Sequence, residues 1–205
     1  MQEFYTIAMV LSIATFTMST VMSPGPNNIM LLSSGLTFGY KKTIPLMFGI
    51  ILGFPLMVLV IGLGLGALFE KFPLVLKVLK IVGILYLFWM AYKIARNTSS
   101  YEIDENNQNK SFTFIQSALF QWVNPKAWIM AITSISVFVS SNENSMFQVI
   151  IIAFIYCLSL CISSNTWAFG GILLKKFIRN AKSVQKINIV MALLLVASVL
   201  PMLFE

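Results

Sequence analysis

The chain has 205 residues, of which 58% are hydrophobic and only 10% are charged, and its mean hydropathy is +0.86. A soluble domain carries about 25% charged residues, so this composition excludes an ordinary water-soluble fold. The net charge of +7 does not indicate a nucleic-acid partner, because most basic residues lie in short segments between hydrophobic runs. The chain has no histidine, which excludes imidazole as a base or metal ligand, and we expect no metal site and no cofactor.

Long runs without charge predict membrane-spanning helices. About 20 mainly apolar residues cross the hydrocarbon core of a bilayer, and helices are the expected form because lipid offers no partner for free backbone groups. The first hydrophobic run has no basic segment before it, so we expect it to be retained. We therefore expect an all-α polytopic protein in the lipid bilayer, with six transmembrane helices at about 4–38, 43–68, 73–92, 112–140, 146–172 and 186–204.

The first predicted span is interrupted by the sequence SPGPNN. Pro24 and Pro26 disrupt helical hydrogen bonding, and Gly25 has little helical preference. The half-helix that begins near Asn27 then presents free N–H groups and a positive dipole end, while the amides of Asn27 and Asn28 can donate and accept. We predict that this break binds the carboxylate and ammonium of an amino acid. The alternative is a proline kink repaired by neighbouring hydroxyls.

A hydrophilic stretch at about 96–111 divides the six spans into three and three. We expect one transporter domain over 1–205, with a first repeat at about 1–95, a flexible linker and a second repeat at about 112–205. Because three is odd, the second repeat enters the membrane in the opposite sense. This is the inverted-repeat architecture of many secondary transporters.

The fourth predicted span carries the corresponding break, in the sequence WVNPKA. Asn124 and Pro125 interrupt the helix, and Lys126 follows near mid-span, where a charged lysine costs roughly 2.5–3.5 kcal/mol on insertion scales. Lys126 could hold a substrate carboxylate or titrate during transport; the alternative is snorkelling to an interface. Ser23 and Asn165 are possible pathway residues, although each could equally bond its own helix.

Basic residues in the loops predict the orientation. The loops after the first, third and fifth spans carry Lys41, Lys42, Lys93, Arg96, Lys110, Lys175, Lys176, Arg179, Lys182 and Lys186. The positive-inside rule places this side in the cytoplasm. Both termini then face outward.

Three motifs resemble the LysE/RhtB family of amino-acid exporters: SPGPNN, LKIVGILYLFWMAYKIAR and NPKAWI. The closing sequences SSNTWAFGGILLKKF and INIVMALLLV are most similar to its cysteine/O-acetylserine exporter branch. The resemblance implies a non-enzymatic exporter of small amino acids in the bacterial inner membrane, driven by the proton gradient. It transfers the family's functional positions onto Pro24, Gly25, Pro26, Asn27, Asn124, Pro125 and Lys126.

The distribution of acidic residues bears on the substrate. No Asp or Glu lies deep in a predicted span, so we expect a neutral amino acid of the cysteine/O-acetylserine or threonine/homoserine kind. Alternatives are an exporter of basic amino acids, with backbone carbonyls replacing an acid, or of another small solute. Further alternatives are an intramembrane enzyme that uses Lys126 with Ser23 or another hydroxyl and a non-transporting assembly protein. A homodimer is possible, but lipid can cover the apolar surface equally well.

Overall fold

The computed structural model describes residues 6–65, 73–96, 111–140, 145–177 and 181–197. Every regular element in these ranges is a helix, which confirms the all-α prediction for this part of the chain. The elements are α1 (Ile7–Met22), α2 (Pro26–Phe38), α3 (Tyr40–Val60), the short π-helical segment η1 (Ile61–Leu65), α5 (Pro73–Arg96), α6 (Phe114–Val123), α7 (Pro125–Phe138), α8 (Ser145–Phe177) and α9 (Ala181–Ala197).

Two of the described helical segments, Tyr40–Gly64 and Ser145–Phe177, are long and apolar enough to cross a membrane by themselves. The pair α1 and α2 would supply a third span if it is counted as one bent helix. Large apolar side chains lie exposed on these helices, for example Phe48 on α3 and Phe154 on α8. This surface suits lipid better than water.

The predicted break in the first span is present. α1 ends at Met22, α2 begins at Pro26, and the two helices are bent by 58°. Pro26 starts α2, where its missing N–H costs nothing because the first turn has no helical acceptor for it. Proline chemistry therefore accounts for both the end of α1 and the start of α2.

The predicted break in the fourth span is also present. α6 ends at Val123 and α7 begins at Pro125, with Asn124 in an extended conformation between them. The start of α6 is fixed by a capping box, in which Thr113 and Gln116 each bond the other's backbone N–H. Both prolines thus begin the second half of a broken helix.

Several helix boundaries differ from prediction because hydropathy locates an apolar run better than the helix around it. α3 begins at Tyr40 instead of near residue 43, and α5 ends at Arg96 instead of near residue 92. α8 continues to Phe177, beyond the predicted end near residue 172, and α9 begins at Ala181 instead of near residue 186. Polar and basic residues extend both helices past the apolar run. Most of the predicted linker, 97–110, lies outside the described residues, as do the terminal segments 1–5 and 198–205.

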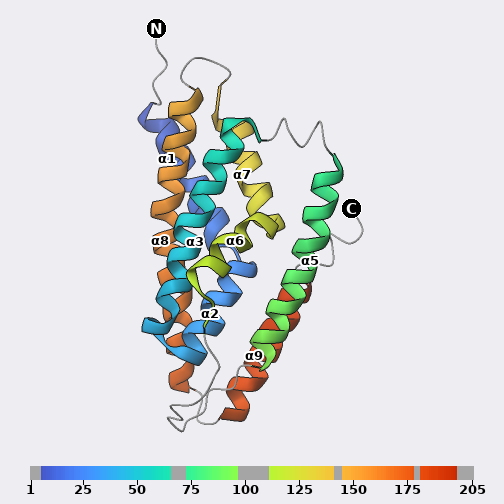
Figure 1. Cartoon of the computed structure of the whole chain (residues 1–205). Coiled ribbons are helices and arrows are strands. Elements are labelled where there is room, and N and C mark those ends of the chain that lie inside the picture. Colours follow the sequence, from blue (N-terminus) through green and yellow to red (C-terminus); the bar gives the residue numbers. More distant parts are fainter. Residues whose placement is uncertain (1–5, 66–72, 97–110, 141–144, 178–180, 198–205) are drawn as a thin grey trace.

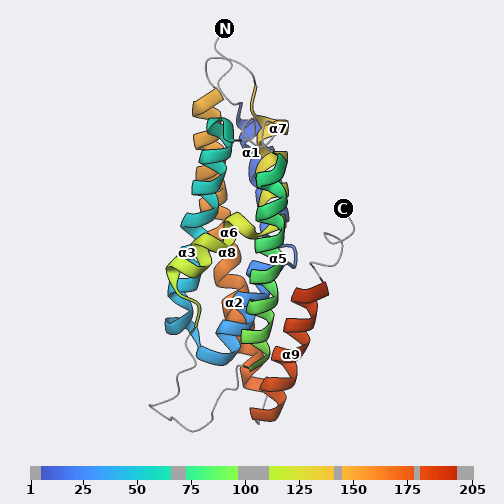
Figure 2. The ribbon, with the colours of Figure 1, turned by 45° about the vertical axis from the view of Figure 1, so that its right-hand side comes forward.

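Most of the helices lie roughly along one axis, and successive predicted spans run in alternating directions (Figure 1). α1, α2, α3, α6, α7 and α8 form one bundle, while α5 and α9 pack against each other alongside it (Figure 2). The bundle's core includes the edge-to-face pair of Phe54 and Tyr156, with ring centroids 4.8 Å apart. The two breaks are therefore held inside one packed bundle.

Glycines allow close contacts between helices in this bundle. A Cβ on Gly35 of α2 would overlap the carbonyl group of Ala168 on α8, and a Cβ on Gly171 of α8 would overlap the carbonyl oxygen of Leu32 on α2. Each glycine thus faces the backbone of the other helix. Such contacts between small residues are a common means of helix association in membranes.

Candidate functional site

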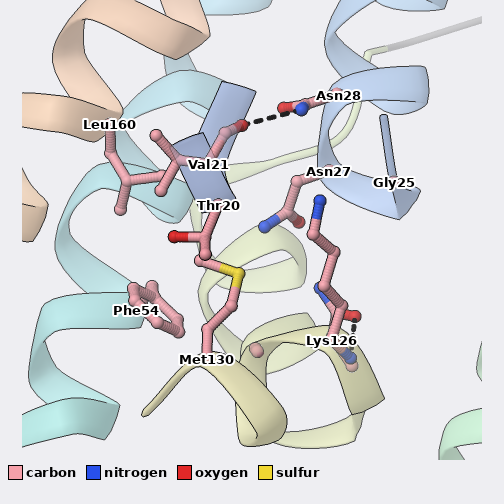
Figure 3. A pocket seen from close by; sticks show the side chains of 11 residues that line it. Thr20, Val21, Gly25, Asn27, Asn28, Phe54, Lys126, Met130 and Leu160 are labelled. Carbon is pink, nitrogen blue, oxygen red and sulfur yellow. Dashed lines mark hydrogen bonds between the residues drawn. The ribbon is translucent and has the colours of Figure 1, made fainter. Parts of the chain in front are cut away.

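The two helix breaks, far apart in sequence, meet at Lys126 (Figure 3). The Nζ atom of Lys126 donates to the carbonyl oxygen of Ser23 at 2.6 Å and to its Oγ at 2.7 Å. A longer bond, of 3.3 Å, reaches the carbonyl oxygen of Pro24. The lysine from the second break therefore satisfies backbone oxygens that the first break frees.

The partners of the Lys126 ammonium are all uncharged oxygens. Ser23 Oγ donates its own proton to the carbonyl of Thr20 at 2.8 Å, so it offers Lys126 only lone pairs. None of the described residues is acidic. Within the described part of the chain, Lys126 consequently has no acidic partner.

Gly25 permits this close approach of the lysine. Its φ of −179° is an extended conformation that any residue can adopt. A Cβ at this position, however, would lie 2.8 Å from Lys126 Cδ and 3.0 Å from Nζ. The glycine is therefore required by the packing of Lys126 more than by the backbone conformation.

The half-helices that follow the two breaks, α2 and α7, differ in how their N-termini are capped. At the start of α7, the side chain of Asn124 accepts from the backbone N–H of Lys126 at 3.2 Å. At the start of α2, Gly25 is the N-cap and no side chain caps the first turn. The N–H groups at the start of α2 remain suited to an anion next to Lys126.

Asn28 repairs the backbone of the first break. Its Nδ2 atom donates to the carbonyls of Val21 and Ser23, both at 2.8 Å, and Ser163 on α8 also donates to Val21 at 2.9 Å. Asn28 is buried. The amide nitrogen of Asn28 therefore takes the repair role that the kink alternative gave to hydroxyls, shared here with Ser163, while Asn28 also lines the pocket.

Asn27 and Gln121 form a reciprocal amide pair between α2 and α6. Asn27 Nδ2 donates to Gln121 Oε1 at 2.9 Å, and Gln121 Nε2 donates back to Asn27 Oδ1 at 3.1 Å. Gln121 Nε2 also donates to the carbonyl of Ser117 at 2.9 Å, which fixes the orientation of both amides. We did not predict Gln121, although an amide side chain within an apolar run, five residues before Lys126, was a usable signal in the sequence.

A small cavity lies between these groups, with apolar and polar residues on different sides (Figure 3). Its volume is about 20 Å³, which is enough for one water molecule but not for an amino acid. Five predicted site residues line it: Gly25, Asn27, Asn28, Asn124 and Lys126. The other lining residues were not predicted as part of the site: Thr20, Val21, Phe54, Ala127, Met130 and Leu160.

The remaining predicted residues lie beside the cavity or away from it. Ser23 and Pro24 contact Lys126 without lining the cavity, and Pro26 and Pro125 start the half-helices. Asn165 instead accepts from the Tyr40 hydroxyl and donates to the Cys161 carbonyl, both at 2.7 Å. The structure does not bring Asn165 to this cavity.

The fold and the site define a class: a helical membrane protein with a positively charged pocket between two broken helices. The chain belongs to the LysE type translocator family, whose family model matches residues 18–202. This confirms the resemblance seen in the motifs of both breaks.

Curated relatives agree with this assignment. A protein of Salmonella choleraesuis (strain SC-B67) is 33% identical over 183 residues, covering 89% of this chain and 91% of the relative. A protein of Escherichia coli O1:K1 / APEC is 31% identical over 183 residues, which again cover 89% of this chain and 91% of the relative. Both relatives are named cysteine/O-acetylserine efflux protein. No solved structure matches the chain.

Proposed function

We propose that this protein is a secondary transporter that exports a small neutral amino acid, of the cysteine or O-acetylserine kind, across the bacterial inner membrane. The observation that carries the proposal is the position of Lys126 beside the uncapped start of α2, in the cavity between the two breaks. The names of the relatives support the substrate class.

The carboxylate of the substrate binds between Lys126 and the first turn of α2. An ammonium group and free backbone N–H groups are the donors that a carboxylate prefers, and the helix dipole adds favourable potential. Asn27, which lines the same cavity, is placed to hold a further polar group of the substrate. In this proposal, the two breaks recognise the polar groups that all amino acids share, and the carboxylate in particular.

The substrate side chain lies against the apolar lining. Val21, Phe54, Met130 and Leu160 contribute apolar surface, and Thr20 contributes one hydroxyl. No described residue could neutralise a cationic side chain, because none is acidic. A small uncharged side chain therefore fits the lining better than that of lysine or arginine.

Transport proceeds by alternating access between two inverted three-helix repeats, within one domain over 1–205 and with repeats at about 1–95 and 112–205. Helix packing supports two equivalent repeats. The broken helix of the first repeat, α1 and α2, packs on α8 of the second, and α6 of the second repeat's broken helix packs on α3 of the first. The third helices of the two repeats, α5 and α9, pack on each other. The first and fourth spans also run in opposite directions (Figure 1). The cavity is too small for an amino acid, so opening requires the broken helices to move.

The basic end of the bundle faces the cytoplasm, and both termini face outward. The junction of α2 and α3, the ends of α5 and α8 and the start of α9 gather at one end of the molecule (Figure 1). These segments carry Lys41, Lys42, Lys93, Arg96, Lys175, Lys176, Lys182 and Lys186. Such clustering is what the positive-inside rule expects of a cytoplasmic side.

Protons are the proposed coupling ion, with Lys126 as the titrating group. It is the ionisable side chain that lines the cavity, so protonation there and substrate binding would influence each other. The oligomeric state stays a prediction: the exposed apolar face of α5, including Leu85, suits either lipid or a second copy.

A hydrolase is the second candidate, because Lys126 Nζ lies 2.7 Å from Ser23 Oγ. A serine–lysine nucleophile needs the lysine to accept the serine proton. Here the Ser23 hydroxyl donates to the carbonyl of Thr20 instead. This direction of the hydrogen bond favours the transporter.

Counterflow in proteoliposomes tests the proposed function. Vesicles loaded with one unlabelled amino acid at a time are exposed to labelled cysteine under reducing conditions. Accumulation of label with small neutral amino acids, but not with lysine or arginine, is the expected result. Failure of every amino acid to exchange, with correctly inserted protein, would overturn the proposal.

A further inference from the structure

The first break forms a small cation site made of neutral oxygens. Three oxygens surround Lys126 Nζ: the carbonyl oxygen of Ser23 at 2.6 Å, the hydroxyl oxygen of Ser23 at 2.7 Å and the carbonyl oxygen of Pro24 at 3.3 Å. The hydroxyl proton of Ser23 points elsewhere, to Thr20. All three atoms therefore act as acceptors, which is the arrangement that binds a primary ammonium group.

The Ser23 carbonyl accepts from Asn28 Nδ2 at 2.8 Å as well as from Lys126, and three other carbonyls of the break are satisfied without Lys126. The Thr20 carbonyl accepts from Ser23 Oγ, the Val21 carbonyl accepts from Asn28 and Ser163, and the Gly25 carbonyl accepts from the backbone of Ile29. Lys126 is thus directed at the oxygens of Ser23 and Pro24 specifically. It is a cation from another helix seated in a preformed acceptor cluster.

We infer that the acceptor cluster of Ser23 and Pro24 is the binding site for the substrate's α-ammonium group, and that Lys126 is a tethered competitor for it. When an amino acid binds, its ammonium displaces the Lys126 ammonium from these oxygens. Lys126 then turns to the substrate's carboxylate, beside the start of α2. The inference rests on the proposed function and adds the recognition chemistry to it.

The exchange requires both charges of a zwitterion. A compound with only an ammonium could displace Lys126 but would leave its charge without a partner. A compound with only a carboxylate could pair with Lys126 but would leave the oxygens of Ser23 and Pro24 without their cation. Either loss removes a charged partner: the Ser23 carbonyl would keep only the Asn28 amide, and Lys126 would keep no acceptor in the first break. Sites built to hydrogen-bond a group strongly reject analogues that lack it.

Deletion analogues of cysteine test this without altering the protein. Cysteamine is cysteine without its carboxylate, and 3-mercaptopropionate is cysteine without its ammonium; neither adds bulk. In counterflow of labelled cysteine, each should compete at least about 100-fold less well than unlabelled cysteine. Competition by 3-mercaptopropionate within a few-fold of cysteine would overturn the ammonium site. Cysteine exchange in that experiment would leave the proposed function standing, whereas no exchange at all would overturn both.

A second measurement separates competition from simple carboxylate binding. Lys126→Met removes the tethered cation, so cysteamine should bind the purified variant at least about 10-fold more tightly than it binds the native protein. Isothermal titration measures this even if transport is lost. Lys93→Met, which removes a lysine that stacks on Trp89 outside the cavity, should leave cysteamine binding unchanged. Weaker or equal cysteamine binding by correctly folded Lys126→Met would contradict the inference.

Discussion

Asn27 and Gln121 exchange two hydrogen bonds, at 2.9 and 3.1 Å, across the contact between α2 and α6. The pair joins the second half of one broken helix to the first half of the other. Because Gln121 is buried, loss of its partner leaves a desolvated amide, at a typical cost of about 1–3 kcal/mol. The orientation of Asn27 in the cavity therefore depends on a residue that does not line it.

Asn27→Leu and Gln121→Leu should each raise the KM for cysteine counterflow by about 10-fold, because each removes the orientation of the pocket amide. The double variant should be little worse than either single one, since the two residues act as one unit. Membrane expression of each variant is the control. An unchanged KM in Asn27→Leu would remove Asn27 from recognition, and fully additive effects would show that the pair is not coupled.

Lys126→Ala should abolish export while the protein inserts normally. The variant removes the ammonium group that faces Ser23 and the start of α2, so it loses the charge that holds a carboxylate. Uptake into proteoliposomes and the amount of inserted protein provide the two measurements. Lys93→Ala is the matched control, and transport by Lys126→Ala at the native rate would exclude Lys126 from the mechanism.

Gly25→Ala should impair transport with little loss of thermal stability. Its Cβ would lie 2.8 Å from Lys126 Cδ, and a flexible lysine can move aside at low energetic cost. The displaced ammonium would no longer reach the oxygens of Ser23. Gly170→Ala is the control, because its Cβ would meet only Leu32 at an ordinary 3.4 Å. Native transport rates for Gly25→Ala would indicate that the position of Lys126 is not critical.

Gly35→Ala should destabilise the fold, by about 1–3 kcal/mol as for other overpacking substitutions. The added methyl group would overlap the backbone of Ala168, and a backbone cannot turn aside as a lysine side chain can. The melting temperature in detergent should fall well below that of Gly170→Ala. Equal melting temperatures for the two variants would mean that α2 and α8 can separate without cost.

The helix breaks could be predicted from sequence because their causes are local. Pro26 and Pro125 each remove an N–H and fix the start of a half-helix, whatever surrounds them. Lys126 stood out for a similar reason, since a lysine within an apolar run needs an explanation in any fold. The partners of Lys126 in the first break could not be predicted, because they depend on how the fourth span packs against the first.

The rest of the cavity depends on tertiary packing. Phe54 and Leu160 belong to α3 and α8, and nothing in their local sequence distinguishes them from other apolar residues of those helices. Asn165 shows the opposite case: a polar residue in an apolar run that bonds Tyr40 and its own helix. Polar residues within the predicted spans could be identified from sequence as candidate site residues. Which of them line the cavity is decided by how the helices pack.

The close contacts at Gly35 and Gly171 couple the position of α8 to that of α2. Because α2 packs on α8 without side chains between the two backbones there, we expect a change of angle at the break before α2 to move α8 with it. With 33 residues, α8 is about 50 Å long. A rotation of about 5° would move its far end by about 4 Å. In the proposed alternating access, a small change of angle beside Lys126 would then produce a larger displacement at the far end of α8.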